Sequence, residues 1–230
     1  MKLSIIIPVY NEANTLDDVI AKIKNVKLED NIIKEIIIVN DGSTDETYDV
    51  LSGYDKDPLI RTYHKKKNSG KSEAVRIGIE HSEGDILLIQ DADLEYDPIN
   101  YSKLIEPIIK NKTKVVYGSR FKGSIENMRL VNRISNIISN VTLRLLYRTH
   151  ITDVNTCYKA FRREVFKDIS IDSKRFMMET EITGKLLKAG YDIQEVPISY
   201  RARSKKEGKK ITWFGALQMY GGIIKYRFFG

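Results

Sequence analysis

The chain has few of the residues that form disulfide bonds or bind zinc. Its 230 residues include one cysteine, Cys157, and three histidines, His64, His81 and His150. A single cysteine cannot form an intramolecular disulfide or a multi-cysteine zinc site. The histidines are scattered along the chain. The sequence therefore excludes a disulfide framework and gives no reason to expect a histidine-rich metal site.

Long apolar runs are also lacking. None approaches the roughly 18–20 residues of a membrane span. The apolar stretch near the N-terminus ends at Pro8 and has no small-residue cleavage site, so we expect no signal peptide. A composition of 42% hydrophobic and 30% charged residues is typical of a globular protein. These features predict a cytoplasmic protein of one domain, or of one domain with a tail.

Charge is distributed unevenly along the chain. Residues 1–100 carry 12 Lys and Arg against 20 Asp and Glu, whereas residues 101–230 carry 26 against 11. An acidic half suits cations, and a basic half suits phosphates, nucleic acid or an anionic membrane surface. The alternative is that much of this charge is solvated surface.

Hydrophobic spacing predicts alternating strands and helices. The expected strands are residues 3–9, 36–39, 59–63, 85–89, 114–117 and 193–200. One helix is expected to begin at Thr15, and a second to begin after Ser43, which forms a capping box with Glu46. Four more expected helices cover residues 72–82, 131–148, 179–189 and 213–229. This alternation predicts a mostly parallel sheet with helices on both faces. Pro197 indicates that the 193–200 strand lies at an edge.

Polar clusters follow four of the expected strands. They are Tyr10–Glu12, Asn40–Ser43, Asp91–Asp93 and Gly118–Arg120. Parallel sheets bind ligands at the carboxyl ends of their strands, so these clusters predict one shared site.

Asp91, Asp93 and Glu95 follow the strand that ends near Gln90. Their carboxylates can converge on one hard cation, and oxygen ligands suit Mg²⁺ or Mn²⁺. A D-x-D sequence by itself can also be a simple turn. Its place after a buried strand favours the metal site.

Lys71 lies in a Gly-Lys-Ser sequence that is not a P-loop, because the upstream glycine and a strong preceding strand are missing. The lysine is expected to meet a phosphate or an acidic residue, or to belong to a plain helix cap. Glu179 and Glu181 fall on different faces of one expected helix, so they are not expected to act as a pair. Cys157 is expected to be a small buried residue.

The ordered motifs resemble those of family 2 glycosyltransferases. The resemblance rests on Ile5–Glu12, Val39–Asp45, Gln90–Glu95 and Gly118–Arg120. Four later segments look like the dolichol-phosphate mannose synthase-like branch: Asp153–Lys159, Glu179–Thr183, Glu195–Tyr200 and Glu207–Ile211. The resemblance extends from residue 3 to about 228.

The resemblance implies a GT-A fold, with a catalytic domain over residues 1–210 and an amphipathic C-terminal helix over residues 211–230. It also implies inverting, metal-dependent transfer of a hexose, with mannose or glucose expected first. The donor would be a GDP- or UDP-linked sugar, the acceptor a polyprenyl or dolichyl phosphate, and the cofactor Mg²⁺ or Mn²⁺.

The resemblance also assigns roles to individual residues. Those expected around the donor nucleotide are Pro8, Tyr10, Glu12, Val39, Asp41, Lys71, Asp91, Ala92 and Asp93. Arg120 and Arg133 would contact phosphate groups, and Arg203 and Lys209 would close over the donor and acceptor phosphates. Lys210 could replace Lys209. Asp153 would order the acceptor pocket or orient a basic residue, or act only as a cap.

The expected mechanism follows from charge. Negative charge builds on the departing nucleoside diphosphate, and a metal ion with Arg and Lys side chains stabilises it. A phosphate monoester has a second pKa near 6, so it is already a nucleophile at neutral pH and needs no general base. The outcome is one displacement with inversion.

A lipid acceptor requires contact with a membrane. Trp213, Leu217, Tyr220, Ile224 and Phe228 share one helical face, which predicts a helix at the interface or one packed on the sheet. We expect a peripheral protein at the cytosolic membrane face, with a membrane-anchoring partner protein as a further option. The main alternative is a GT-A enzyme that uses a glycan or protein hydroxyl acceptor; nucleic-acid binding is disfavoured because no such motif is present.

Overall fold

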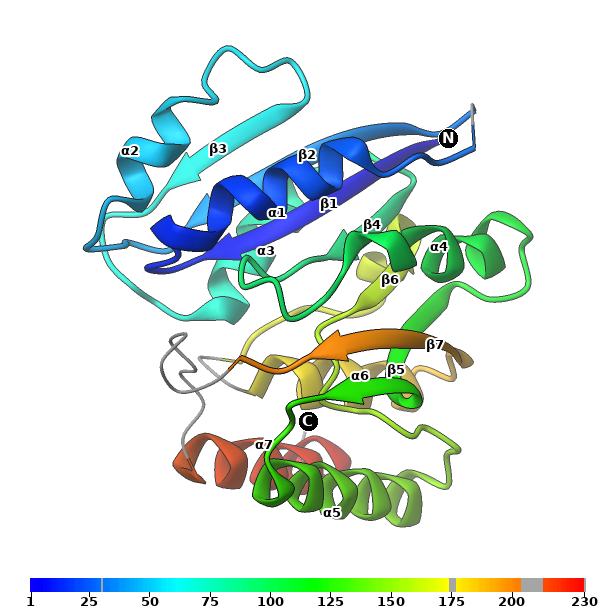
Figure 1. The fold of residues 1–230 in the computed structure, drawn as a ribbon. Coiled ribbons are helices and arrows are strands. Elements are labelled where there is room, and N and C mark those ends of the chain that lie inside the picture. Colours follow the sequence, from blue (N-terminus) through cyan, green and yellow to red (C-terminus); the bar gives the residue numbers. More distant parts are fainter. Residues whose placement is uncertain (30, 174–176, 204–212, 230) are drawn as a thin grey trace.

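A computed structural model describes the chain except for residues 30, 174–176, 204–212 and 230. In the part that it describes, seven strands form one sheet in the order β3-β2-β1-β4-β6-β5-β7 (Figure 1). The strands are β1 (Lys2–Val9), β2 (Ile33–Asn40), β3 (Ile60–His64), β4 (Ile86–Ile89), β5 (Val115–Glu126), β6 (Lys159–Arg162) and β7 (Ile193–Arg201). Only β6 runs antiparallel to its neighbours, β4 and β5, so the mostly parallel sheet is confirmed. β7 is an edge strand, as Pro197 predicts.

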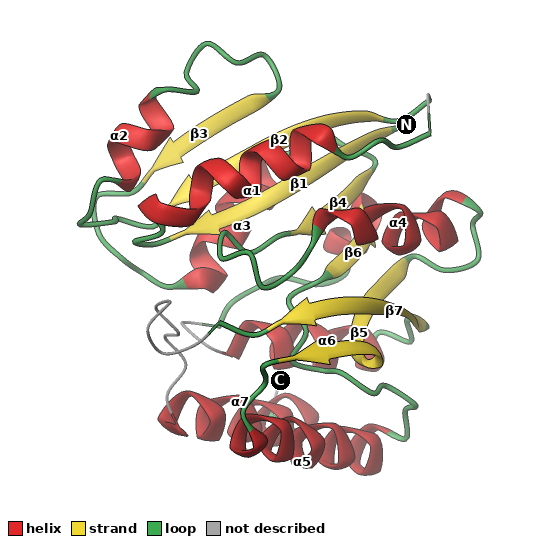
Figure 2. Ribbon diagram, in the orientation of Figure 1, coloured by secondary structure: helices red, strands yellow, loops and turns green. Residues whose placement is uncertain are grey.

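Helices cover both faces of this sheet (Figure 2). The helical elements are α1 (Ala13–Asn25), α2 (Thr47–Ser52), α3 (Lys71–His81), η1 (Pro98–Asn100), α4 (Tyr101–Ile109), α5 (Leu130–Tyr147), η2 (Arg163–Lys167), α6 (Met178–Lys188) and α7 (Trp213–Phe228). The apolar stripes of α1 and α4 pack on one face of the sheet, and those of α3 and α6 pack on the other. Burial of these stripes supplies the main driving force for folding.

Two helix starts differ from the predictions. The Ser43–Glu46 capping box does not form, because the Ser43 hydroxyl accepts a hydrogen bond from the backbone N–H of Asn11 and the helix begins at Thr47. The first helix begins at Ala13 rather than at Thr15. The Thr15 hydroxyl instead donates to the carbonyl of Ala92 over 2.6 Å, a contact between segments 77 residues apart. Both side chains serve tertiary contacts rather than caps.

Helix α5 is confirmed, but its apolar stripe does not face the core. A surface helix normally buries this stripe. Here the buried residues are Ser139, Asn140 and Leu143. The exposed apolar side chains are Leu130, Val131, Ile134, Ile137, Ile138, Val141 and Leu145.

Helix α7 packs against α5 and α6 at one end of the molecule (Figure 1). The Thr142 hydroxyl of α5 donates to Tyr220, and Ile223 is fully buried. Ile224 and Phe228 are exposed, on a different side from Ile223. The predicted C-terminal helix therefore exists, while the side chains of Trp213 and Leu217 lie outside the described residues, and the domain division at residue 210 stays a prediction. None of the helices in the described ranges is long and apolar enough to cross a bilayer.

Candidate active site

The carboxyl ends of β1, β2 and β4 surround a cavity of about 550 Å³. Its described lining includes nine of the predicted site residues: Pro8, Tyr10, Glu12, Asp41, Lys71, Asp91, Ala92, Asp93 and Arg203. Glu95, predicted as a metal ligand, lines it as well. The expectation that polar strand ends share one site is therefore met for three of the four clusters, since Arg120 lies outside the lining.

The loop after β4 holds three carboxylates in fixed positions. Leu94 has a φ of 60°, a backbone conformation that residues other than glycine rarely adopt. This turn lets the backbone N–H of Glu95 donate to the Asp93 carboxylate over 3.1 Å. The Thr15 hydroxyl holds the carbonyl of Ala92 from α1. These two hydrogen bonds hold the loop at its Ala92 and Asp93 positions.

Lys71 lies between two carboxylates. Its Nζ atom is 2.7 Å from Oδ1 of Asp91 and 3.1 Å from Oε1 of Glu179, and it also contacts Sγ of Cys157 at 3.1 Å. Burial by itself would lower the pKa of this lysine, but the interactions with Asp91, then Cys157 and then Glu179 outweigh burial and raise it. The same contact keeps the pKa of Asp91 below its usual value despite burial. Lys71 is therefore a fixed cation that holds Asp91 ionised.

Arg203 faces the other carboxylates from the end of β7. Its guanidinium lies 2.9 Å from Oδ2 of Asp93 and 3.0 Å from Oε2 of Glu12. Its backbone N–H donates to Glu95 over 2.8 Å. Burial raises the pKa of the Asp93 carboxyl to about 7, and the charges of Asp91 and Glu95 add to that effect. The cluster thus holds more negative charge than Arg203 neutralises.

This donor set fits a hard divalent cation. The described lining carries six carboxylates against two cationic side chains, and burial, with the charges of Asp91 and Glu95, raises the pKa of Asp93. Among the described residues, no three His, Cys, Asp or Glu side chains already stand together as ligands of one ion. The carboxylates of Asp91 and Asp93 face Lys71 and Arg203 instead. To gather around a metal, these two carboxylates would have to turn away from Lys71 and Arg203.

Asp41 lines the cavity at the carboxyl end of β2. Its carboxylate accepts hydrogen bonds from the backbone N–H groups of Ser69 and Gly70 and from Lys65 Nζ. Gly42 has a φ of 69°, and a Cβ atom there would lie 2.6 Å from the Lys67 backbone, so only glycine lets the two loops meet. Asp41 therefore fixes the wall, and its expected contact with a base or ribose stays a prediction.

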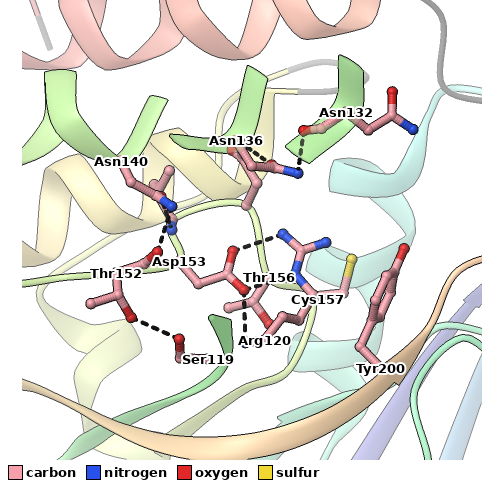
Figure 3. Close-up of polar contacts among 12 residues, drawn as sticks. Ser119, Arg120, Asn132, Asn136, Asn140, Thr152, Asp153, Thr156, Cys157 and Tyr200 are labelled. Carbon is pink, nitrogen blue, oxygen red and sulfur yellow. Dashed lines mark hydrogen bonds and ion pairs between the residues drawn. The ribbon is translucent and has the colours of Figure 1, made fainter. Parts of the chain in front are cut away.

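Arg120 and Asp153 form a buried pair next to the cavity (Figure 3). Two guanidinium nitrogens of Arg120 donate to the Asp153 carboxylate over 2.7 Å each, and the ring of Tyr200 lies 5.0 Å from the guanidinium. Glu195 in turn accepts a hydrogen bond from the Asp153 backbone. Of the roles expected for Asp153, this geometry matches the orientation of a basic residue.

Three predicted residues lie elsewhere. Val39 is buried under α3 and does not line the cavity. Arg133 is exposed on α5, outside the described lining. Lys209, like its alternative Lys210, falls outside the described residues. Their expected contacts with the donor or with phosphate stay predictions.

Further lining residues that no sequence pattern assigned to the site include Asn68, Asn155, Glu179 and Met219. Cys157 was expected to be a small buried residue, yet it lines the cavity beside Lys71. For Glu179, the sequence indicates only that its side chain lies on a different face of the helix from Glu181. Glu181 indeed faces away from the cavity, toward Lys185 and the backbone of Asp172, so the expectation that the two glutamates do not pair is confirmed.

Sequence comparison identifies relatives of this chain. The sequence model of glycosyl transferase family 2 matches residues 4–170. Dolichol-phosphate mannosyltransferase of Pyrococcus furiosus is 31% identical over 217 residues, which are 91% of this chain and 59% of that protein. Dolichyl-phosphate beta-glucosyltransferase ALG5A of Trichomonas vaginalis is 30% identical over 99% of this chain and 73% of its own length. The chain thus spans only about three fifths of the first of these relatives.

Solved structures show the same fold at lower identity. Glucosyl-3-phosphoglycerate synthase of Mycobacterium tuberculosis, in complex with Mn²⁺, uridine diphosphate and glucosyl-3-phosphoglycerate, superposes with a TM-score of 0.74. It is 20% identical, and the match covers 98% of this chain and 79% of that one. The predicted α/β fold of the GT-A type is confirmed, as is the resemblance on which it rests.

Proposed function

Because this chain belongs to glycosyl transferase family 2, we propose that it transfers a hexosyl group from a nucleoside-diphosphate sugar to a polyprenyl or dolichyl phosphate. The observation that carries the proposal is the cavity itself. It places carboxylates, a fixed lysine and an arginine from six separate elements around one space large enough for a nucleotide sugar. Mannose or glucose, carried on GDP or UDP, is the hexose we expect.

The nucleoside end of the donor belongs at the β1–β2 side of the cavity. Pro8, Tyr10 and Asp41 line that side, and the carboxylates that follow β4 come next along the sheet. This order suits a ligand with an uncharged aromatic base at one end and a charged diphosphate in its middle. The solved relative in complex with uridine diphosphate and Mn²⁺ supports such a donor.

Asp91, Asp93 and Glu95 are the residues that would hold Mg²⁺ or Mn²⁺. Bound there, the ion would neutralise charge on the donor diphosphate. Lys71 keeps Asp91 ionised and oriented for that role. Arg203 faces the same carboxylates, and its planar guanidinium suits two phosphate oxygens once they enter.

The reaction exchanges one bond for another at the anomeric carbon. An oxygen of the acceptor phosphate forms the new C–O bond while the bond to the diphosphate breaks, and the electron pair leaves with the nucleoside diphosphate. The acceptor is dianionic near neutral pH, so no side chain has to remove a proton from it. The names of the two lipid-phosphate transferases among the relatives support this acceptor.

The exposed face of α5 is the surface that we propose for membrane contact. Val131 and Leu145 are 70% and 75% exposed, on a stripe that spans the whole helix. Arg129, Arg133 and Arg144 lie on or beside the same helix, so apolar contact would be joined by attraction to anionic lipid headgroups. We further propose a peripheral position at the cytosolic membrane face, with or without an anchoring partner protein.

A transfer assay tests the function. Purified chain is mixed with Mg²⁺ or Mn²⁺, polyprenyl phosphate in detergent and a panel of labelled GDP- and UDP-sugars. Chelator-sensitive label in the organic phase, from one donor, is the expected result. Label that instead appears on a soluble sugar or peptide acceptor would overturn the lipid acceptor and favour transfer to a hydroxyl group.

A further inference from the structure

Asn155 presents a buried hydrogen-bond acceptor at the cavity wall. The residue lines the cavity and is 8% exposed. Its Oδ1 atom has no hydrogen-bond partner among the described residues. Buried polar atoms in folded proteins are nearly always hydrogen-bonded. An unpaired acceptor beside a ligand cavity therefore indicates a donor that arrives with the ligand.

Helix α5 fixes which way this amide points. Nδ2 of Asn136 donates to the backbone carbonyl of Asn132 over 2.9 Å (Figure 3). A carbonyl only accepts, so the amide of Asn136 is oriented and its Oδ1 is left to accept. Nδ2 of Asn155 donates to that oxygen over 2.9 Å. The side chain of Asn155 therefore contacts α5 through Nδ2, and Oδ1 makes no hydrogen bond to that helix.

The partner of this oxygen has to carry a hydrogen atom. A phosphate dianion and an ionised diphosphate only accept hydrogen bonds, so neither can pair with Asn155 Oδ1. The donor groups on a nucleotide sugar are the hydroxyls of its sugars and the N–H groups of its base. Asn155 therefore selects for one of these groups and not for either phosphate.

Strand order separates these groups along the cavity. The sheet runs β2, β1, β4, β6, so Asp41 and Pro8 lie toward one end, Asp91 follows in the middle, and Asn155, just before β6, comes last. With the nucleoside at Asp41 and the diphosphate over β4, the group that reaches Asn155 is the hexose. This step rests on the proposed function. We propose that Asn155 Oδ1 accepts a hydrogen bond from one hydroxyl of the donor hexose and so binds the sugar part of the donor.

The test compares two ligands that differ only in the hexose. Calorimetry in magnesium buffer gives the Kd of UDP and UDP-glucose, and of GDP and GDP-mannose, for the wild type, Asn155→Ala and Asn155→Asp. Asn155→Ala should raise the Kd of the nucleotide sugar by roughly 5- to 100-fold and leave the Kd of the nucleoside diphosphate unchanged. Asn155→Asp keeps an acceptor oxygen and loses the donor to Asn136. It should therefore retain the wild-type ratio of the two Kd values.

Asn132→Ala is the matched control. It lies on the same helix, and alanine keeps the backbone carbonyl that Asn136 uses, so both Kd values should match the wild type. Equal weakening of both ligands by Asn155→Ala, or no weakening of either, would overturn the assignment. A ratio that shifts as expected, with no transfer of sugar to lipid phosphate, would contradict the proposed acceptor alone. A wild type that binds neither pair would overturn both proposals.

Discussion

Arg203 and Asp93 are 110 residues apart in the sequence, yet the guanidinium lies 2.9 Å from the Asp93 carboxylate. The contact joins the end of β7, an edge strand, to the loop after β4 in the first half of the sheet. It links the basic half of the chain to the acidic half inside the cavity. The charge asymmetry of the sequence is therefore not only a property of the surface.

Removing Arg203 should slow transfer much more than it affects folding. In Arg203→Ala the cation that faces the donor diphosphate is lost, and we expect kcat to fall by at least about 100-fold. Arg201→Ala is the matched control, because Arg201 is exposed at the end of β7, two residues before Arg203, and does not line the cavity. Steady-state transfer rates check this prediction. Similar rates in the two variants would remove Arg203 from the reaction.

Metal affinity should depend on pH through Asp93. Burial, with the charges of Asp91 and Glu95, raises the pKa of the Asp93 carboxyl to about 7. A carboxylate must lose its proton before it binds a metal, so protons and metal compete below that pH. Mn²⁺ affinity, measured by electron paramagnetic resonance, should be level above about pH 7 and fall by up to about tenfold per unit below it.

The Asp93→Asn variant is the control for this titration. It should bind Mn²⁺ more weakly than the wild type and lose the pH dependence around neutrality, because the titrating group is gone. A wild-type affinity that stays constant from about pH 5.5 to 8 would contradict the role of Asp93.

Glu35 should stabilise the fold in a pH-dependent way. Its carboxylate contacts Lys2 and Arg61 at 2.8 Å each and accepts hydrogen bonds from Ser4 and from the backbone of Glu83. Burial opposes ionisation, but these contacts outweigh burial and lower the pKa to about 2. A lowered pKa stabilises the native state above the ordinary value of 4.5, and this stabilisation is lost as pH falls from 4.5 toward 2.

Glu35→Gln should therefore lower the free energy of unfolding near neutral pH by about 1–3 kcal/mol. The difference from the wild type should shrink as the solution is acidified below the ordinary pKa. Urea titrations at several pH values measure it, with Glu80→Gln, an exposed glutamate of α3, as the control. A difference that grows on acidification would show that the sign is wrong.

The apolar face of α5 should govern binding to lipid vesicles. Replacing Val131, Ile134 and Leu145 by serine removes exposed side chains, so folding stability should change little. If these side chains enter the interface, the partition coefficient should fall by at least about 100-fold. Sedimentation with vesicles that contain anionic lipid measures this. Ile33→Ser, an exposed apolar side chain at the start of β2, is the control, and equal loss in both variants would contradict the proposed surface.

The sequence was informative wherever a site residue directly follows a buried strand. Asp41 and Asp91 could be predicted for this reason, because the ends of parallel strands meet at one edge of the sheet. Glu179 could not, since its contact with Lys71 joins segments 108 residues apart and leaves no local pattern. The same holds for Asn155, whose hydrogen bond to Asn136 exists only once α5 has docked.

Fold prediction failed where local patterns were short or had a second use. Strand β6 has four residues and lacks the apolar run that marks β4, a strand of the same length. It also runs antiparallel between parallel neighbours. The α5 pattern predicts a helix correctly, but periodicity does not tell which face is covered. The sequence around Ser43 fits a capping box, but its hydroxyl accepts a hydrogen bond from the backbone N–H of Asn11 in a different loop.

The structure of the lipid product tests the central claim most directly. Phosphorus-31 spectra and mass spectra of the organic phase, after incubation with the accepted donor, distinguish a phosphate monoester from a hexosyl phosphodiester. We predict conversion to the diester by the wild type, and at least about 100-fold slower conversion by Asp91→Asn. Release of nucleoside diphosphate while the lipid remains a monoester would contradict the account.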